Sequence, residues 1–222
     1  MRLPLATAAS ASILQRLKQQ RGKYGREIAF VFRHTGILAT SGIEAAQYFA
    51  FGCIETFFPI YLNETRGYST WSIGLLFTAQ IVSAAFTKPI MGRLSDRVGR
   101  IPMITGGLIL GGLATALLIR SNYYVLSLIL MAVFGLGLAT VTASTSAFVA
   151  DLSRSEGRGG AMGVLSSIMD IGQSLGPIVT GLIIAASSYT LAFTLVGLAM
   201  IVISLGYGLS VGRMAKPHRS TD

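Results

Sequence analysis

Charged residues and cysteines are scarce in this sequence. Only 12% of its 222 residues are Asp, Glu, Lys or Arg, whereas 52% are hydrophobic, and the mean hydropathy is +0.63. A chain of this length with so little charge is too apolar for a soluble domain, so it belongs in a membrane. The single cysteine, Cys53, lies in an apolar run and can form no disulfide within the chain, which makes it a small packing residue.

Histidine and acidic residues are also few. The two histidines, His34 and His218, lie in basic flanks, so no Cys/His cluster offers a metal site, and we expect neither a cofactor nor an enzyme. Lys and Arg outnumber Asp and Glu by 18 to 9, for a net charge of +9. In a membrane protein such an excess collects in cytoplasmic loops and meets anionic lipid. We therefore expect a lipid bilayer as partner, and no nucleic acid.

Long apolar runs fill most of the remaining sequence. Each is close to the roughly 20 residues that cross the hydrocarbon core of a bilayer as a helix. The sequence predicts an all-α, polytopic membrane protein with six transmembrane helices in a domain at 39–212. A basic leader at 1–38 precedes this domain, and a tail at 213–222 follows it. The six predicted spans are 40–62, 70–91, 101–119, 123–149, 160–185 and 189–211.

The positions of Lys and Arg predict which helix ends face the cytoplasm. Fifteen of the 18 basic residues lie in the leader, in the charged segments after the second and fourth spans, and in the tail. The opposite loops hold only Arg66 and Arg120, and Lys88 lies within a span. By the positive-inside rule both termini are cytoplasmic, as an even number of spans requires. We expect the protein in the plasma (inner) membrane.

A charged segment at 92–100 lies between the second and third spans, where we expect a tight interfacial turn. Its residues fit the pattern G-x-x-x-D-R-x-G-R, which resembles the signature between the second and third helices of a major facilitator superfamily half. Ile101 stands where that family often has a further basic residue. The matching residues are Gly92, Asp96, Arg97, Gly99 and Arg100.

The resemblance implies six helices built as two three-helix repeats, which form half of a twelve-helix transporter. Met131 stands where the fourth helix of an N-terminal half usually carries arginine, and the basic leader resembles the linker between halves. These features favour the C-terminal half, whose partner is a complementary N-terminal half. In the family the signature aspartate locks the cytoplasmic side by engaging a helix end, which assigns this role to Asp96. A self-sufficient six-helix protein that pairs with a second copy, as a carrier or pore, stays open.

Polar side chains inside the apolar runs are the candidate pathway residues. Charges at such positions are costly and usually face a protein interior or a wet cavity. Glu44 and Glu55 are 11 positions apart, close to three helical turns, which places them on one face together with Gln47. Asp170 lies nearly midway along the fifth span, and Gln173 follows it by three positions. The resemblance implies that the first and fourth helices line the cavity.

Several interpretations of these groups stay open. Glu44 either reaches the lipid headgroups or faces the pathway, and the hydroxyls at 140–146 either bond to their own helix or line the pathway. Desolvation favours a protonated carboxyl, so Glu55 or Asp170 could bind and release a proton as water access alternates. We expect alternating-access transport of a small solute, coupled to a proton or another ion. Acidic residues favour cationic solutes, as in the drug exporters that this chain resembles, unless they serve protons alone.

Overall fold

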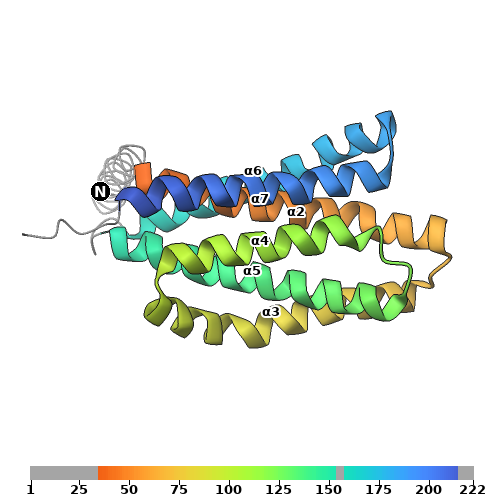
Figure 1. Cartoon of the computed structure of the whole chain (residues 1–222), viewed down its shortest axis with the longest axis horizontal. Helices are drawn as coiled ribbons and strands as arrows, with labels where there is room; N and C mark the ends of the chain where they lie inside the picture. The colour runs from red at the N-terminus through yellow and green to blue at the C-terminus, as the bar shows by residue number, and fades with distance from the viewer. Residues whose placement is uncertain (1–34, 154–157, 215–222) are drawn as a thin grey trace, which may run out of the picture.

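Six long helices lie side by side in the computed structural model, which describes residues 35–153 and 158–214, with side chains as far as residue 210 (Figure 1). All six are long and apolar enough to cross a membrane, and the described residues contain no strand. The predicted all-α, six-span fold class is therefore confirmed. Most of the predicted leader and tail lies outside the described residues. The helices are α2 (Thr35–Arg66), α3 (Thr70–Val98), α4 (Arg100–Leu118), α5 (Tyr124–Leu152), α6 (Arg158–Ala186) and α7 (Tyr189–Met214).

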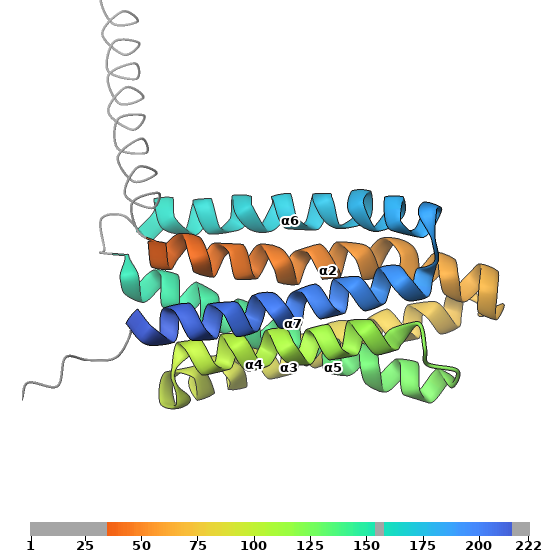
Figure 2. The ribbon, with the colours of Figure 1, turned by 45° about the horizontal axis from the view of Figure 1, so that its top comes forward.

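The helices form two interlocked sets of three, α2–α4 and α5–α7. The first helix of each set packs mainly on the second helix of the other, so that α2 lies on α6 and α5 lies on α3. The third helices, α4 and α7, pack on each other. Figure 2 shows α6 and α2 adjacent along one side of the bundle. The packing of α2 on α6 and of α5 on α3 is the arrangement that two three-helix repeats produce. In this arrangement α2 and α5 are the most buried helices, and α3 and α6 are the most exposed.

Glycines bring the paired helices into backbone contact. A Cβ atom at Gly135 of α5 would lie 2.2 Å from the carbonyl oxygen of Gln80 in α3. A Cβ at Gly172 of α6 would lie 2.2 Å from the carbonyl oxygen of Ala45 in α2. No side chain fits at either position unless the helices move apart. Small residues therefore set the distance between the helices of each pair.

The charged segment at 92–100 is mostly helical, which corrects the tight turn that we expected there. Helix α3 continues to Val98, α4 begins at Arg100, and Gly99 alone separates them. Gly99 has φ +108°, which strains any residue with a Cβ, and its N–H donates to the carbonyl oxygen of Ser95 at 3.1 Å. One glycine thus ends the first helix and reverses the chain, so the signature residues around it stand on two helix ends.

Both ends of the described chain lie at the same end of the bundle as the α3–α4 connection (Figure 1). We call this the basic end, after Arg93, Arg97, Arg100 and Arg158. The α2–α3, α4–α5 and α6–α7 connections lie at the other end. Six antiparallel crossings therefore return the chain to the side on which it started, as predicted. That the basic end faces the cytoplasm stays a prediction.

Candidate functional site

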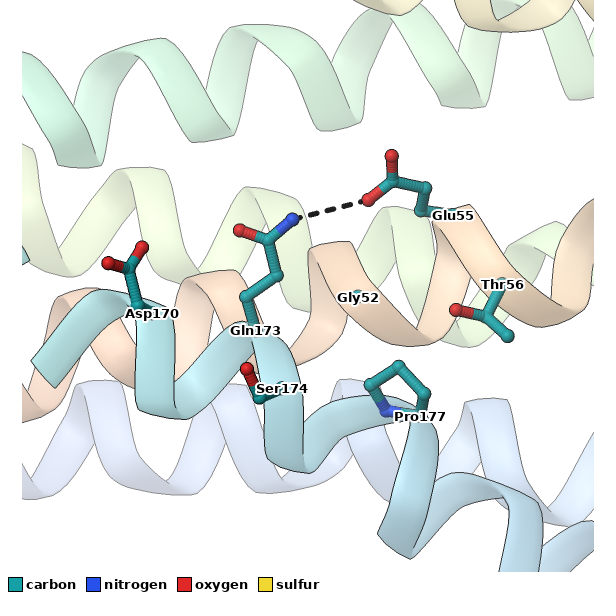
Figure 3. A pocket seen from close by; sticks show the side chains of 7 residues that line it. All are labelled: Gly52, Glu55, Thr56, Asp170, Gln173, Ser174 and Pro177. Carbon is teal, nitrogen blue, oxygen red and sulfur yellow. Dashed lines mark hydrogen bonds between the residues drawn. The ribbon is translucent and has the colours of Figure 1, made fainter. Parts of the chain in front are cut away.

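An open pocket of about 340 Å³ lies between α2 and α6. It brings together three of the predicted pathway residues, Glu55 from α2 and Asp170 and Gln173 from α6 (Figure 3). None of its seven lining residues is basic, so its potential favours a proton or a cation. The lining residues are Gly52, Glu55, Thr56, Asp170, Gln173, Ser174 and Pro177.

Gly52 and Pro177 build the contact between the two helices beneath these polar groups. A Cβ at Gly52 would lie 2.3 Å from the carbonyl oxygen of Gln173 and 3.1 Å from Cδ of Pro177. Proline has no N–H, so the Gln173 carbonyl, four residues earlier, lacks its usual helical donor. Close approach of the two backbones at this point holds Gln173 beside Glu55.

The polar side chains of the pocket interact across the α2–α6 contact. Nε2 of Gln173 donates a hydrogen bond to Oε2 of Glu55 at 3.3 Å, and Asp170 points to the same side of α6 (Figure 3). Glu55 and Asp170 are exposed on the surface of the bundle, although both lie well inside their helices. Exposed apolar side chains also lie on α6, among them Ile171, which follows Asp170 in the sequence, and Ile178.

The structure places Glu44 and Gln47 away from this pocket, inside the bundle. Glu44 is 3% exposed, and Oγ1 of Thr145 in α5 donates to its Oε2 at 2.5 Å. Gln47 is fully buried against Gly111 of α4, and among the described residues neither of its amide atoms has a hydrogen-bond partner. The interpretation in which Glu44 reaches the lipid headgroups is therefore wrong. Helix periodicity puts Glu44 and Glu55 on one face of α2, but α5 covers that face only at Glu44.

The hydroxyl run of α5 bonds mainly to its own helix. Thr140, Thr142 and Thr145 each donate to the carbonyl four residues earlier, at 2.7, 2.9 and 2.9 Å. The interpretation in which these hydroxyls bond to their own helix is thus confirmed for these three threonines. Thr145 also reaches α2 through Glu44, a contact between residues 101 positions apart. The sequence carried no signal that selects Thr145 from its neighbours.

The signature residues form a charge cluster at the basic end. Arg100 makes an ion pair with Asp96 at 2.6 Å and a second with Asp151, at the end of α5, at 3.1 Å. Arg100 thereby connects the α3–α4 connection to α5. Sequence reasoning missed Asp151, which lies 51 residues away. The side chain of Asp96 is still 59% exposed, which leaves it accessible to another helix, while Arg97 is exposed on the end of α3.

The described residues contain no group of three or more His, Cys, Asp or Glu side chains that could hold a metal ion. The chemistry of the two sites is instead that of single carboxyl groups with neutral partners. Glu55 has an amide partner in an open pocket, whereas Glu44 has a hydroxyl partner in the interior.

Comparisons with known proteins agree with this architecture. The sequence model of the Major Facilitator Superfamily matches residues 41–221. The quinolone resistance protein NorA of Staphylococcus aureus is 26% identical over 170 residues, which cover 77% of this chain and 42% of NorA. The glycine betaine/proline/ectoine/pipecolic acid transporter OusA of Dickeya dadantii is 28% identical over 132 residues, or 60% of this chain and 25% of OusA. The chain matches less than half the length of both curated relatives.

Proposed function

The chain belongs to the major facilitator superfamily, a family of membrane transporters and not of enzymes, and from this membership we propose that it forms one six-helix half of a transporter. The transporter moves a small solute by alternating access between two halves. The pairing of its helices as two three-helix repeats and the partial coverage of both relatives support this arrangement. The partner is a complementary six-helix half, N-terminal to this one in the arrangement that the sequence favours.

The observation that carries this proposal is the open pocket between α2 and α6. Glu55 and Asp170 lie well inside helices of 32 and 29 residues, at a depth where hydrocarbon surrounds a lipid-facing side chain. A charged side chain at the centre of a membrane helix costs about 2.5–3.5 kcal/mol on insertion scales. Two exposed carboxyl groups therefore belong against a water-filled path or a second six-helix unit. We assign the pocket to the solute path.

Coupling to a proton or another cation is proposed for the same carboxyl groups. When the path is open, water reaches Glu55 and favours its ionised form, which accepts the hydrogen bond from Gln173. When the two halves close over the pocket, loss of water favours the protonated form. Because none of the seven lining residues is basic, the pocket favours a solute with positive charge. The match to a quinolone resistance protein favours export as the direction.

The test is gradient-driven transport of a fluorescent organic cation by the intact transporter in lipid vesicles. Glu55→Gln should abolish transport driven by a proton gradient and leave folding unchanged, because glutamine keeps the shape but cannot ionise. The matched control is Glu64→Gln, which makes the same change in the same helix at an exposed position outside the pocket. Undiminished transport by Glu55→Gln would remove Glu55 from the mechanism.

A second arrangement is a carrier or pore made from two copies of this chain. The exposed apolar faces of α3 and α6 favour it, since a second copy could cover them; Phe86 is 73% exposed and Leu182 is 68% exposed. An antibody against residues 216–222, used on membranes of the source cells, tests whether a second half is fused to this chain; an unfused chain needs a separate partner half or a second copy. A band near 23.5 kDa indicates a separate six-helix polypeptide, and a band at about twice that mass indicates a fused second half.

A further inference from the structure

Glu44 and Thr145 form a buried polar contact between α2 and α5, the first helices of the two three-helix sets. Their residue exposures are 3% and 0%. A small apolar cluster that includes Ile37 and Val149 lies on the side of the basic end. The main apolar core, which includes Ile43, continues along α2. The pair therefore lies in a layer from which apolar side chains exclude water.

Few charged groups surround this carboxyl. Lys88 of α3 acts on Glu44 electrostatically, and Glu44 in turn acts, together with Asp170 of α6, on Tyr48 of α2. Within the described ranges, none of the three forms a hydrogen bond or an ion pair with the Glu44 carboxyl, and from α5 only the neutral hydroxyl of Thr145 does. Lys88 is itself exposed. An ionised carboxylate with one neutral partner is unstable in such surroundings.

Counting hydrogens distinguishes the two protonation states. The Thr145 hydroxyl has one hydrogen and three acceptors within reach: Oε2 of Glu44 at 2.5 Å, the Val141 carbonyl oxygen at 2.9 Å and the Thr142 carbonyl oxygen at 3.3 Å. With Glu44 ionised, the hydroxyl must donate to the carboxylate, and its hydrogen bond to the Val141 carbonyl oxygen is lost. With Glu44 protonated, the carboxyl O–H donates to Thr145, whose hydroxyl then donates to Val141. Only the protonated form makes both contacts at once.

Gln47 can supply the donor that an ionised Glu44 lacks. It follows Glu44 by three residues in α2, so the two side chains are neighbours on one face of the helix. Its Nε2 and Oε1 atoms are buried and have no hydrogen-bond partner in the part of the chain that the structure describes. Such unsatisfied groups destabilise a fold. A bond from Nε2 to the ionised carboxylate would relieve this and support the charge.

We propose that Glu44 is a second proton-binding group of the transporter, separate from the pocket, and that Thr145 is its positioning residue. The heavy-atom distances fit the proton-bound state, because the Thr145 hydroxyl lies within hydrogen-bond distance of Glu44 and of Val141 at once. When the alternating-access movement admits water to Glu44, the proton passes to that water, the Thr145 hydroxyl turns from Val141 to the carboxylate, and Gln47 turns to donate as well. Each proton thus changes the bonding between the two three-helix repeats. The inference deepens the proposed transport function and rests on it.

The test is pH-dependent infrared difference spectroscopy on the intact protein that contains this chain, in lipid vesicles. We expect a carbonyl-stretch band of a protonated carboxylic acid that disappears as pH rises and is missing in Glu44→Gln. Glu55→Gln and Asp170→Asn, which alter the pocket, should keep the band. Thr145→Val should shift its frequency because the hydroxyl partner is lost, and Thr145→Ser should restore the wild-type position. If Thr145 had only a structural role, Thr145→Val would leave the frequency of this band unchanged.

Two results overturn the inference: the same titrating carboxyl band in wild type and Glu44→Gln, or an unmoved band in Thr145→Val. If circular dichroism shows that Glu44→Gln does not fold, the comparison of Thr145→Val with Thr145→Ser decides the matter. Infrared spectra need no solute, so this failure differs from failure of the transport proposal. That proposal fails in the uptake assay, through undiminished transport by Glu55→Gln.

Discussion

Adding one methyl group at Gly52 tests how closely the backbones of α2 and α6 approach beneath the pocket. In Gly52→Ala the new Cβ would lie 2.3 Å from the Gln173 carbonyl oxygen. Such a contact needs at least about 3.4 Å, so the helices must separate by about 1 Å at this point. Gln173 then withdraws from Glu55, and the 3.3 Å hydrogen bond between their side chains lengthens beyond bonding distance.

The magnitude follows from the cost of overpacking. Inserting a methylene-sized group into a packed interface typically destabilises a protein by about 1–3 kcal/mol. The matched control is Gly42→Ala in the same helix, where a Cβ would meet nothing within 4 Å. There alanine replaces glycine in a helix without a clash, and should stabilise it by about 0.5–1 kcal/mol. The two variants should therefore move stability in opposite directions.

Thermal unfolding of the purified protein in detergent, followed by circular dichroism, measures this difference. We expect a lower Tm than wild type for Gly52→Ala and an equal or higher Tm for Gly42→Ala. Gly52→Ala should also slow gradient-driven transport, because the Glu55–Gln173 contact is disturbed. If Gly52→Ala unfolds at or above the Tm of Gly42→Ala, the two backbones do not meet as described, and the account of how the pocket is built is refuted.

Two further predictions concern contacts between helices. Arg100→Ala removes the ion pairs with Asp96 and Asp151, so it should reduce transport. It should lower Tm only slightly, since both carboxylates are exposed and exposed ion pairs contribute about 0–1 kcal/mol; an unchanged transport rate would contradict this. Ser83→Ala removes the 2.7 Å hydrogen bond to the Ala132 carbonyl between α3 and α5 and should destabilise by about 0.5–1.5 kcal/mol in thermal unfolding. Ser167→Ala, whose hydroxyl bonds to its own helix, is its control, and equal losses for both would contradict the interhelical role.

Local signals predicted the elements. Span lengths follow from apolar runs, and the charged segment at 92–100 marked the reversal between α3 and α4, which the structure places at Gly99, whose positive φ suits glycine. The sequence placed that reversal in a longer turn than the structure shows. Hydropathy changes near the membrane boundary, whereas a helix continues until its hydrogen bonding is interrupted, here at Val98.

The sequence identified the individual residues of the candidate site, but not which of them lie together. Glu55, Asp170 and Gln173 stood out because polar groups are costly in apolar spans, and the structure gathers them in one pocket. Glu44 stood out for the same reason, yet it lies in the interior with Thr145. Helix periodicity gives the face of a residue, but not which neighbouring helix covers that face at a given height.

The sequence by itself determined that this protein is a six-span membrane protein of the major facilitator type, because span length, charge distribution and the signature are local properties of the chain. Only the tertiary structure decided which helices pair, that Arg100 joins Asp151, and that Glu44 is enclosed while Glu55 is open. These contacts join residues far apart in the chain. They depend on how closely glycine-lined helices approach, which is a property of two packed surfaces and not of either sequence segment alone.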